Sequence, residues 1–292
     1  HITLPGDAIK ASEGIIIKTA VSVLFIIPWK DQWMIGTTDT EYLGDEGEPL
    51  ADRSDVQYIL DQANRVLQPK INIDQVIGVF AGLRPLVANK KESDTTKLSR
   101  EHTVDRPVPG FVSLAGGKYT TYRVMAEDAV DMATNDITKL VGESTTEKLP
   151  IIGADGYWAL EQQVDVIAAE YSLKPVTVTH LLNRYGSEIG EILQLIQADR
   201  KLAAPVLREL PYLKAELIYA VTHEGAQSIS DVMERRTRIW FEASDYGLAI
   251  VNAVADVIAP YLGWKAPQKK ASITEYKELV QRAKISAANL HK

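Results

Sequence analysis

The sequence changes character near residue 140, and this change restricts the fold more than any other feature of the chain. Before it, short β-branched and aromatic runs separated by turn residues are typical of strands. After residue 150 almost every segment has helical spacing, and glycine or proline separates one segment from the next. The pattern predicts an α+β portion followed by an all-helical C-terminal domain. The length of 292 residues agrees with about two domains.

Local patterns place the expected elements along the chain. The run Val21–Trp29, a polar turn and the run Trp33–Thr38 are typical of a hairpin. Apolar residues at helical spacing over Asp52–Leu67 indicate a helix, which Asp52 or Ser54 can cap. Further strands are expected at Val76–Val87, Lys97–Val104 and Phe111–Ala115, and helices at Tyr119–Leu140, Trp158–Tyr171, Pro175–Tyr185, Ile189–Ala198, Lys214–His223, Ser230–Phe241, Tyr246–Leu262 and Thr274–Leu290.

Charge and motif content argue against several functions. The chain carries 32 Lys and Arg against 39 Asp and Glu, and this net charge of −7 argues against nucleic acid as a main partner. The absence of Cys excludes disulfides and thiolate zinc sites, and the five His are scattered, so no metal site is expected. No Gly-x-Gly-x-x-Gly follows a strand, and the segment AGGKYTTYR lacks the first glycine of a P-loop. We expect neither a membrane span nor a signal peptide.

A glycine turn between a predicted strand and a predicted helix is the first candidate site. The start of a helix exposes unpaired N–H groups, and the pair Gly116-Gly117 lets a ligand approach the backbone closely. Lys118 adds a full charge, and Thr120 and Thr121 add hydroxyls. The segment therefore predicts a site for an anion or for the electron-rich edge of a heteroaromatic ring. A tight turn with a solvated lysine is the alternative.

Isolated cations near strand ends are the second kind of candidate. Arg84 lies in an otherwise apolar run, where a charge must be paired or must face a functional cavity. Arg100 lies near the end of a short predicted strand, and a solvated edge arginine is its alternative. In the helical region the basic run Arg235–Arg238 indicates a solvated face or local ion pairs, with docking of a partner as the second interpretation.

Four motifs then occur in the order and at the spacing of one family: IGTTDTEY (Ile35–Tyr42), FAGLRPL (Phe80–Leu86), LSREH (Leu98–His102) and AGGKYTTYR (Ala115–Arg123). With the following MAEDAVD they closely resemble the FAD-dependent glycerol-3-phosphate dehydrogenases. The segment Ala215–Ile239 resembles the C-terminal helical domain of that family, so the resemblance covers nearly the whole chain. The family's N-terminal FAD-binding fingerprint is missing here. The chain thus looks like a C-terminal portion that begins at the segment carrying the family's active-site histidine, His1.

The resemblance implies a fold in three parts. Residues 1–110 would form an antiparallel substrate-binding sheet, and residues 111–146 the last strand and helix of the FAD-binding domain. Residues 147–292 would form the helical C-terminal domain.

The resemblance also implies an activity and its residues. The family oxidises sn-glycerol 3-phosphate to dihydroxyacetone phosphate, hydride passes to FAD, and electrons leave to a membrane quinone or, in oxidase relatives, to oxygen. By motif match, Arg84, Arg100 and Lys118 hold the phosphate, and His1 is the base or polarises the hydroxyl, so the catalytic residues are His1, Arg84 and Lys118. Three cations on separate segments suit a phosphate dianion. The residues placed against the flavin are Gly116, Gly117, Lys118, Tyr119, Thr120 and Thr121.

Partners and alternatives follow from the same resemblance. A cytoplasmic location is expected, and peripheral contact with the inner face of the membrane and a homodimer are open expectations. Without the FAD-binding half, the chain alone is expected to be inactive. The alternative is a non-catalytic interaction fragment whose helical domain mediates dimer or membrane contacts. A third reading is a related amine or hydroxy-acid flavoenzyme, whose carboxylate substrate needs fewer cations.

Overall fold

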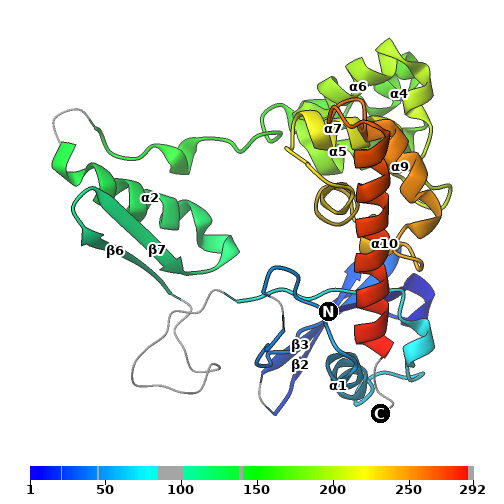
Figure 1. The fold of residues 1–292 in the computed structure, drawn as a ribbon, viewed down its shortest axis with the longest axis horizontal. Helices are drawn as coiled ribbons and strands as arrows, with labels where there is room; N and C mark the ends of the chain where they lie inside the picture. The colour runs from blue at the N-terminus through cyan, green and yellow to red at the C-terminus, as the bar shows by residue number, and fades with distance from the viewer. Residues whose placement is uncertain (21, 45, 85–100, 138–140, 289–292) are drawn as a thin grey trace. The chain divides into compact units, whose positions relative to one another are not determined.

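The chain falls into two units in a computed structural model that describes residues 1–20, 22–44, 46–84, 101–137 and 141–288. Unit 1 contains His1–Thr38, Leu50–Ala81 and Ile152–Lys292. Unit 2 contains Asp39–Pro49 and Gly82–Ile151. The sheet of the N-terminal part and the helical region therefore belong to one unit (Figure 1).

A five-stranded antiparallel sheet is the base of unit 1, with the strand order β2-β3-β4-β1-β5. Side chains alternate between the two faces of a strand, and Ile2, Ile26 and Ile35 are fully buried on one face. Helix α1 (Arg53–Ala63) covers that face and shares its core. The strands are β1 (Ile2–Pro5), β2 (Ile15–Lys18), β3 (Val23–Trp29), β4 (Gln32–Gly36) and β5 (Gly78–Val79).

The predicted hairpin is confirmed, because β3 pairs with β4 across a two-residue turn. Lys30 in this turn has a φ of 52°, which matches the left-handed backbone that such tight hairpins use. Sequence analysis missed β1 and β2. Both have only four residues, and β1 becomes a central strand through pairing with β4 and β5, which are distant in sequence. Of the expected strand Val76–Val87, only Gly78–Val79 is a strand among the described residues.

The helical region has two cores, one formed by residues of α4 to α7 and the other by residues of α7 to α10. The long α10 contacts α9 and also α1, so it connects the helical region with the sheet (Figure 1). The helices are α3 (Tyr157–Glu161), α4 (Val164–Tyr171), α5 (Pro175–Tyr185), α6 (Ile189–Ala198), α7 (Lys214–Thr222), α8 (Ile239–Glu242), α9 (Val251–Ile258) and α10 (Ala266–Ala288).

One predicted helix, Ser230–Phe241, is broken in the structure. A π-helical segment, Asp231–Arg236, ends at Thr237, and α8 begins after it. The amide of Thr237 donates to the carbonyl of Val232, five residues back, and the Thr237 hydroxyl donates to the same oxygen at 2.7 Å. These local bonds compete with the regular helical ladder and redirect the chain.

Unit 2 contains a hairpin of β6 (His102–Val108) and β7 (Phe111–Gly116), which contacts helix α2 (Tyr122–Thr134). No described residue of these three elements is fully buried. Large apolar side chains are exposed on all of them: Val108, Phe111, Leu114, Tyr122, Val124 and Val130. The unit therefore lacks a core of its own in the described part of the chain.

The predicted fold class is confirmed, since antiparallel sheets are followed by a helical C-terminal region. The domain boundaries at residues 110 and 146 stay a prediction. Within the described residues, no helix is both long enough and apolar enough to cross a membrane.

Candidate functional site

His1 lies on the face of the sheet opposite α1. Because side chains alternate along β1, Ile2 points into the core while His1 and Thr3 point to the other face. The backbone of His1 exchanges hydrogen bonds of 2.9 and 3.1 Å with Phe80, which extends the β1–β5 ladder by one pair. The imidazole stacks on the Phe80 ring, with centroids 4.9 Å apart and an interplanar angle of 5°.

Gly36 leaves the space that the His1 ring occupies. A Cβ at this position would overlap the imidazole. Gly36 pairs with Phe25 of β3, and Phe25 pairs with Ile16 of β2. Phe25 is 37% exposed and Ile16 is 68% exposed. His1 thus belongs to a row of side chains that crosses an open, apolar sheet face.

Arg84 has a carboxylate partner in unit 2. Its Nε lies 3.4 Å from Oδ2 of Asp39, and both side chains keep some exposure. Asp39 belongs to the IGTTDTEY motif, and sequence analysis did not select it because its partner lies 45 positions away. The ion pair satisfies the charge of Arg84 and leaves part of its guanidinium accessible. Arg100, the second predicted phosphate ligand, lies outside the described residues.

The glycine turn has the geometry that the sequence predicts. Gly116 and Gly117 have φ values of 76° and 82°, in the left-handed region that favours glycine. A Cβ on Gly117 would lie 2.5 Å from the sulfur of Met125 on α2, so the turn sits tightly on the helix. Lys118 is exposed, and its carbonyl accepts hydrogen bonds of 3.0 Å from the amide and the hydroxyl of Thr121.

The other residues of the turn are accessible as well. Tyr119 is 92% exposed, and Thr120 is exposed just before α2 begins. The turn therefore presents backbone amides, hydroxyls and one ammonium group together at the start of a helix.

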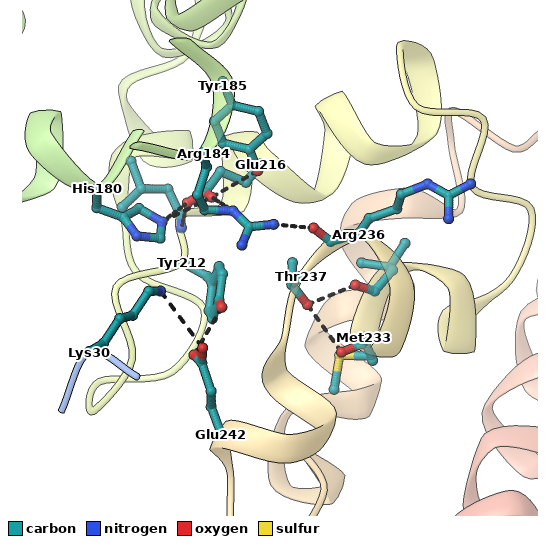
Figure 2. A network of polar contacts seen from close by, with 12 residues as sticks. Lys30, His180, Arg184, Tyr185, Tyr212, Glu216, Met233, Arg236, Thr237 and Glu242 are labelled. Carbon is teal, nitrogen blue, oxygen red and sulfur yellow. Dashed lines mark hydrogen bonds and ion pairs between the residues drawn. The ribbon is translucent and has the colours of Figure 1, made fainter. Parts of the chain in front are cut away.

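A buried polar network in the helical region was not found by sequence analysis (Figure 2). Glu216 of α7 is fully buried, and both of its oxygens contact His180 Nε2, at 3.2 and 3.1 Å. The hydroxyl of Tyr185 and the amide of Leu213 donate to it at 2.9 and 2.7 Å. Arg184 lies 3.7 Å away and also donates to a backbone carbonyl, that of Arg236. Such a carboxylate is tolerated in a core only because both of its oxygens have hydrogen-bond or ionic partners.

The same region reaches the sheet through a second carboxylate, Glu242 (Figure 2). Tyr212 donates to Glu242 at 2.9 Å, and Nζ of Lys30, in the β3–β4 turn, lies 3.7 Å from it. Burial lowers the pKa of the Lys30 ammonium, and the charge of Glu242 opposes this shift. Burial also raises the pKa of the Tyr212 hydroxyl, and Glu242 raises it further. A charged pair therefore joins the sheet to the helices.

The arginines of the basic run all contact other residues of the chain. Arg235 pairs with Asp231 at 3.3 Å, and Arg236 donates to the carbonyl of Glu224 at 2.8 Å. Arg238 lies over the ring of Trp29, 4.8 Å from its centroid. The local ion pair of Arg235 and the other contacts within the chain favour a structural role of the run over partner docking.

The structure places the predicted site residues in both units. His1 belongs to unit 1, and Arg84, Lys118 and the glycine turn belong to unit 2. Each of them is accessible within its own unit. Within the described ranges, no three His, Asp or Glu side chains come together in a way that could hold a metal ion.

Family models match both halves of the chain. Residues 1–131 match the model described as FAD dependent oxidoreductase. Residues 144–269 match the model described as the C-terminal domain of alpha-glycerophosphate oxidase.

Individual proteins are similar over the whole chain. A glycerol-3-phosphate dehydrogenase of Mycobacterium leprae is 45% identical over 99% of the chain, and a mitochondrial one of Arabidopsis thaliana is 31% identical over 98%. The chain covers 49% and 48% of these two proteins, so it spans about half of their length. The crystal structure of the glycerol-3-phosphate dehydrogenase from Bacillus halodurans, complexed with FAD, covers the chain fully with a TM-score of 0.79 at 25% identity. The chain covers 57% of that structure.

Proposed function

Because the chain belongs to the family of FAD-dependent glycerol-3-phosphate dehydrogenases and corresponds to a C-terminal portion of them, we propose that it forms the substrate side of a site that oxidises sn-glycerol 3-phosphate to dihydroxyacetone phosphate. The resemblance and the FAD dependence predicted from the motifs are confirmed by these matches. The observation that carries the proposal is the place of His1 on an open sheet face, beside a glycine that makes room for its ring. The full-length protein, meaning this chain with the half of its relatives that it does not cover, is the active form.

The reaction removes a proton from the secondary hydroxyl and a hydride from the carbon that bears it. FAD accepts the hydride when it is bound. The imidazole of His1 takes the hydroxyl proton as a general base. Phe80 covers one face of the imidazole, so the substrate meets the ring from its edge or from the open side.

The phosphate of the substrate is held by Arg84, Arg100 and Lys118. Arginine binds phosphate with two parallel N–H donors, and lysine acts as a point charge. The carboxylate of Asp39 restricts the guanidinium of Arg84, which supports a site ordered before the substrate arrives.

The turn from Gly116 to Thr121 holds the cofactor. Its two left-handed glycines present backbone without side chains, and the helix that follows directs free N–H groups at the same point. The partial positive charge at the start of this helix would stabilise negative charge on a ring system bound there. The exposed apolar side chains of β6, β7 and α2 support a fold in which further chain covers this unit.

The finer expectations stand as proposals. The electron acceptor of the full-length protein is a membrane quinone. The protein is cytoplasmic, contacts the inner face of the membrane peripherally and forms a homodimer. The 292-residue chain alone is inactive, because the glycine-rich FAD fingerprint is absent from it.

An arginine substitution in the full-length protein tests the proposal. We expect Arg84→Ala to lower kcat/KM for glycerol 3-phosphate by about 10- to 100-fold, because a charge-assisted hydrogen bond contributes about 1.5–3 kcal/mol. Arg65→Ala is the matched control, since Arg65 is exposed near the end of α1 and contacts Gln62. An unchanged kcat/KM for Arg84→Ala would contradict the phosphate assignment. Anaerobic bleaching of the flavin by glycerol 3-phosphate tests the reaction itself.

A second candidate function is favoured by one observation. Trp158, Val166 and Val176 are 74%, 63% and 70% exposed on the first three helices of the helical region. Exposed apolar side chains mark interaction surfaces where they form one contiguous patch. In this reading the helical region mediates dimer or membrane contacts, and the chain is not catalytic. A monomer by size-exclusion mass that does not bind liposomes would contradict it.

A further inference from the structure

A short segment of the helical region docks on the sheet face that carries His1. The hydroxyl of Thr3, next to His1 on that face, donates to the carbonyl of Phe241 at 2.8 Å. The indole of Trp240 donates to the carbonyl of Val79 at 3.4 Å. Gly78 allows this close approach, because a Cβ there would lie 2.8 Å from Cα and O of Phe241. The docking of this segment therefore depends on a close approach of two backbones as well as on side-chain hydrogen bonds.

The docked segment ends in an aromatic stack on His1. The ring of Phe241 lies 5.1 Å from that of Phe80, at 38°, and the Phe80 ring in turn lies parallel to the imidazole of His1. All three residues are only partly buried. The stack therefore stands at the edge of the open face, while Phe241 also packs against the core of the helical region.

The break at Thr237 explains how Phe241 reaches this position. A continuous helix over the predicted range Ser230–Phe241 would carry its last turn straight on along one axis. The π-helical segment ends instead, and α8 starts in a new direction with its own hydrogen bonds. Such interruptions are frequent at functional positions.

We infer that Phe241 is a positioning residue for the reaction: through Phe80 it holds the imidazole of His1 in the orientation that proton transfer requires. The inference rests on the proposed role of His1 and gives the helical region a part in catalysis. Gly36 limits the ring on one side and the Phe80–Phe241 pair limits it on the other. Misplacement of a catalytic group by about 1 Å can cost on the order of 100-fold in rate.

The test is a double-mutant cycle in the full-length protein. Phe241→Leu is expected to lower kcat about tenfold or more and to leave KM for glycerol 3-phosphate and the bound FAD unchanged. Phe241→Tyr keeps the ring and is expected to restore kcat. On the His1→Gln background, Phe241→Leu is expected to cause no further loss, because its effect passes through the imidazole. Tyr261→Leu, at an aromatic position of the same helical region that is 48% exposed, is the control.

Each outcome separates the two proposals. An equal loss of kcat in both backgrounds would show a general structural role for Phe241 and overturn the inference alone. So would an unchanged kcat for Phe241→Leu while His1→Gln loses activity. An unchanged kcat for His1→Gln would overturn the role of His1 as base and the inference with it. If Phe241→Leu does not fold, Phe241→Met and Phe80→Leu carry the same test.

Discussion

Gly36 and His1 occupy neighbouring strands, and the imidazole fills the space that any side chain at Gly36 would need. The glycine is therefore required by a contact and not by its backbone conformation. Its position in the IGTTDTEY motif links a sequence signal to the placement of the candidate base.

Gly36→Ala is expected to lower kcat of the full-length protein by about 10- to 100-fold, because the added methyl group displaces the imidazole. The bound FAD is expected to stay unchanged. Gly190→Ala is the control, since nothing lies within 4 Å of a Cβ there. Steady-state kinetics and flavin absorbance measure the effect, and equal kinetics for both variants would contradict the geometry.

Gly117→Ala is expected to reduce the FAD content of the full-length protein. An alanine at a φ of 82° costs about 1 kcal/mol or more, and its methyl group would press on Met125. Gly110→Ala is a matched control, because it has a φ of 79° but open space around it. Flavin absorbance per protein measures the loss. If Gly110→Ala loses as much FAD as Gly117→Ala, backbone strain in the hairpin is the cause, and the contact with Met125 is not.

Glu216→Ala is expected to destabilise the helical region by about 3–5 kcal/mol, because it leaves His180, Arg184 and Tyr185 without their buried carboxylate. Urea unfolding followed by far-UV circular dichroism measures this change in the free energy of unfolding. Glu170→Ala, at an exposed position of α4, is the control and is expected to change little. A loss below about 1 kcal/mol for Glu216→Ala would mean that the network does not stabilise the fold.

Asp52 is expected to stabilise α1 in a pH-dependent way. Hydrogen bonds from the Ser54 hydroxyl and the Asp55 amide lower the pKa of its carboxyl below the usual 3.8. Its stabilising effect is therefore complete above the unfolded value and is lost as the pH falls through the folded one. Asp52→Ala is expected to cost about 1 kcal/mol at neutral pH and less in acid.

Asp52→Asn separates capping from titration. Asparagine caps a helix about as well but does not ionise, so the variant is expected to keep the stability and lose its pH dependence. Urea midpoints at several pH values measure both variants. The same difference between wild type and Asp52→Ala at all pH values would contradict the assignment.

Sequence patterns correctly predicted those helices, strands and turns whose formation depends on residues close together in the chain. The range Pro175–Tyr185 is predicted residue by residue, since proline starts the helix and glycine follows it. The strand, glycine turn and helix around Gly117 are also as expected. Strand β1 was missed, because four residues carry too little pattern and its partners lie far along the chain.

The residues of the candidate site also fall into those that the sequence identified and those that only the structure revealed. The motifs singled out His1, Arg84 and Lys118, but nothing near them in sequence points to Asp39 or Phe241 as neighbours. Asp39 meets Arg84 across 45 positions, and Phe241 reaches the His1 face across 240. Glu216 lies in the expected helix Lys214–His223 and had no role assigned to it, yet it is fully buried.

The sequence by itself determined the change from strands to helices, the glycine turn, the family and the cations, because these depend on residue type and short-range spacing. The tertiary structure alone decided which face of the sheet stays open around His1, which ring packs behind Phe80 and which carboxylates are buried. The physical reason is that burial and pairing depend on distances between segments, which a linear pattern does not encode until the chain has folded.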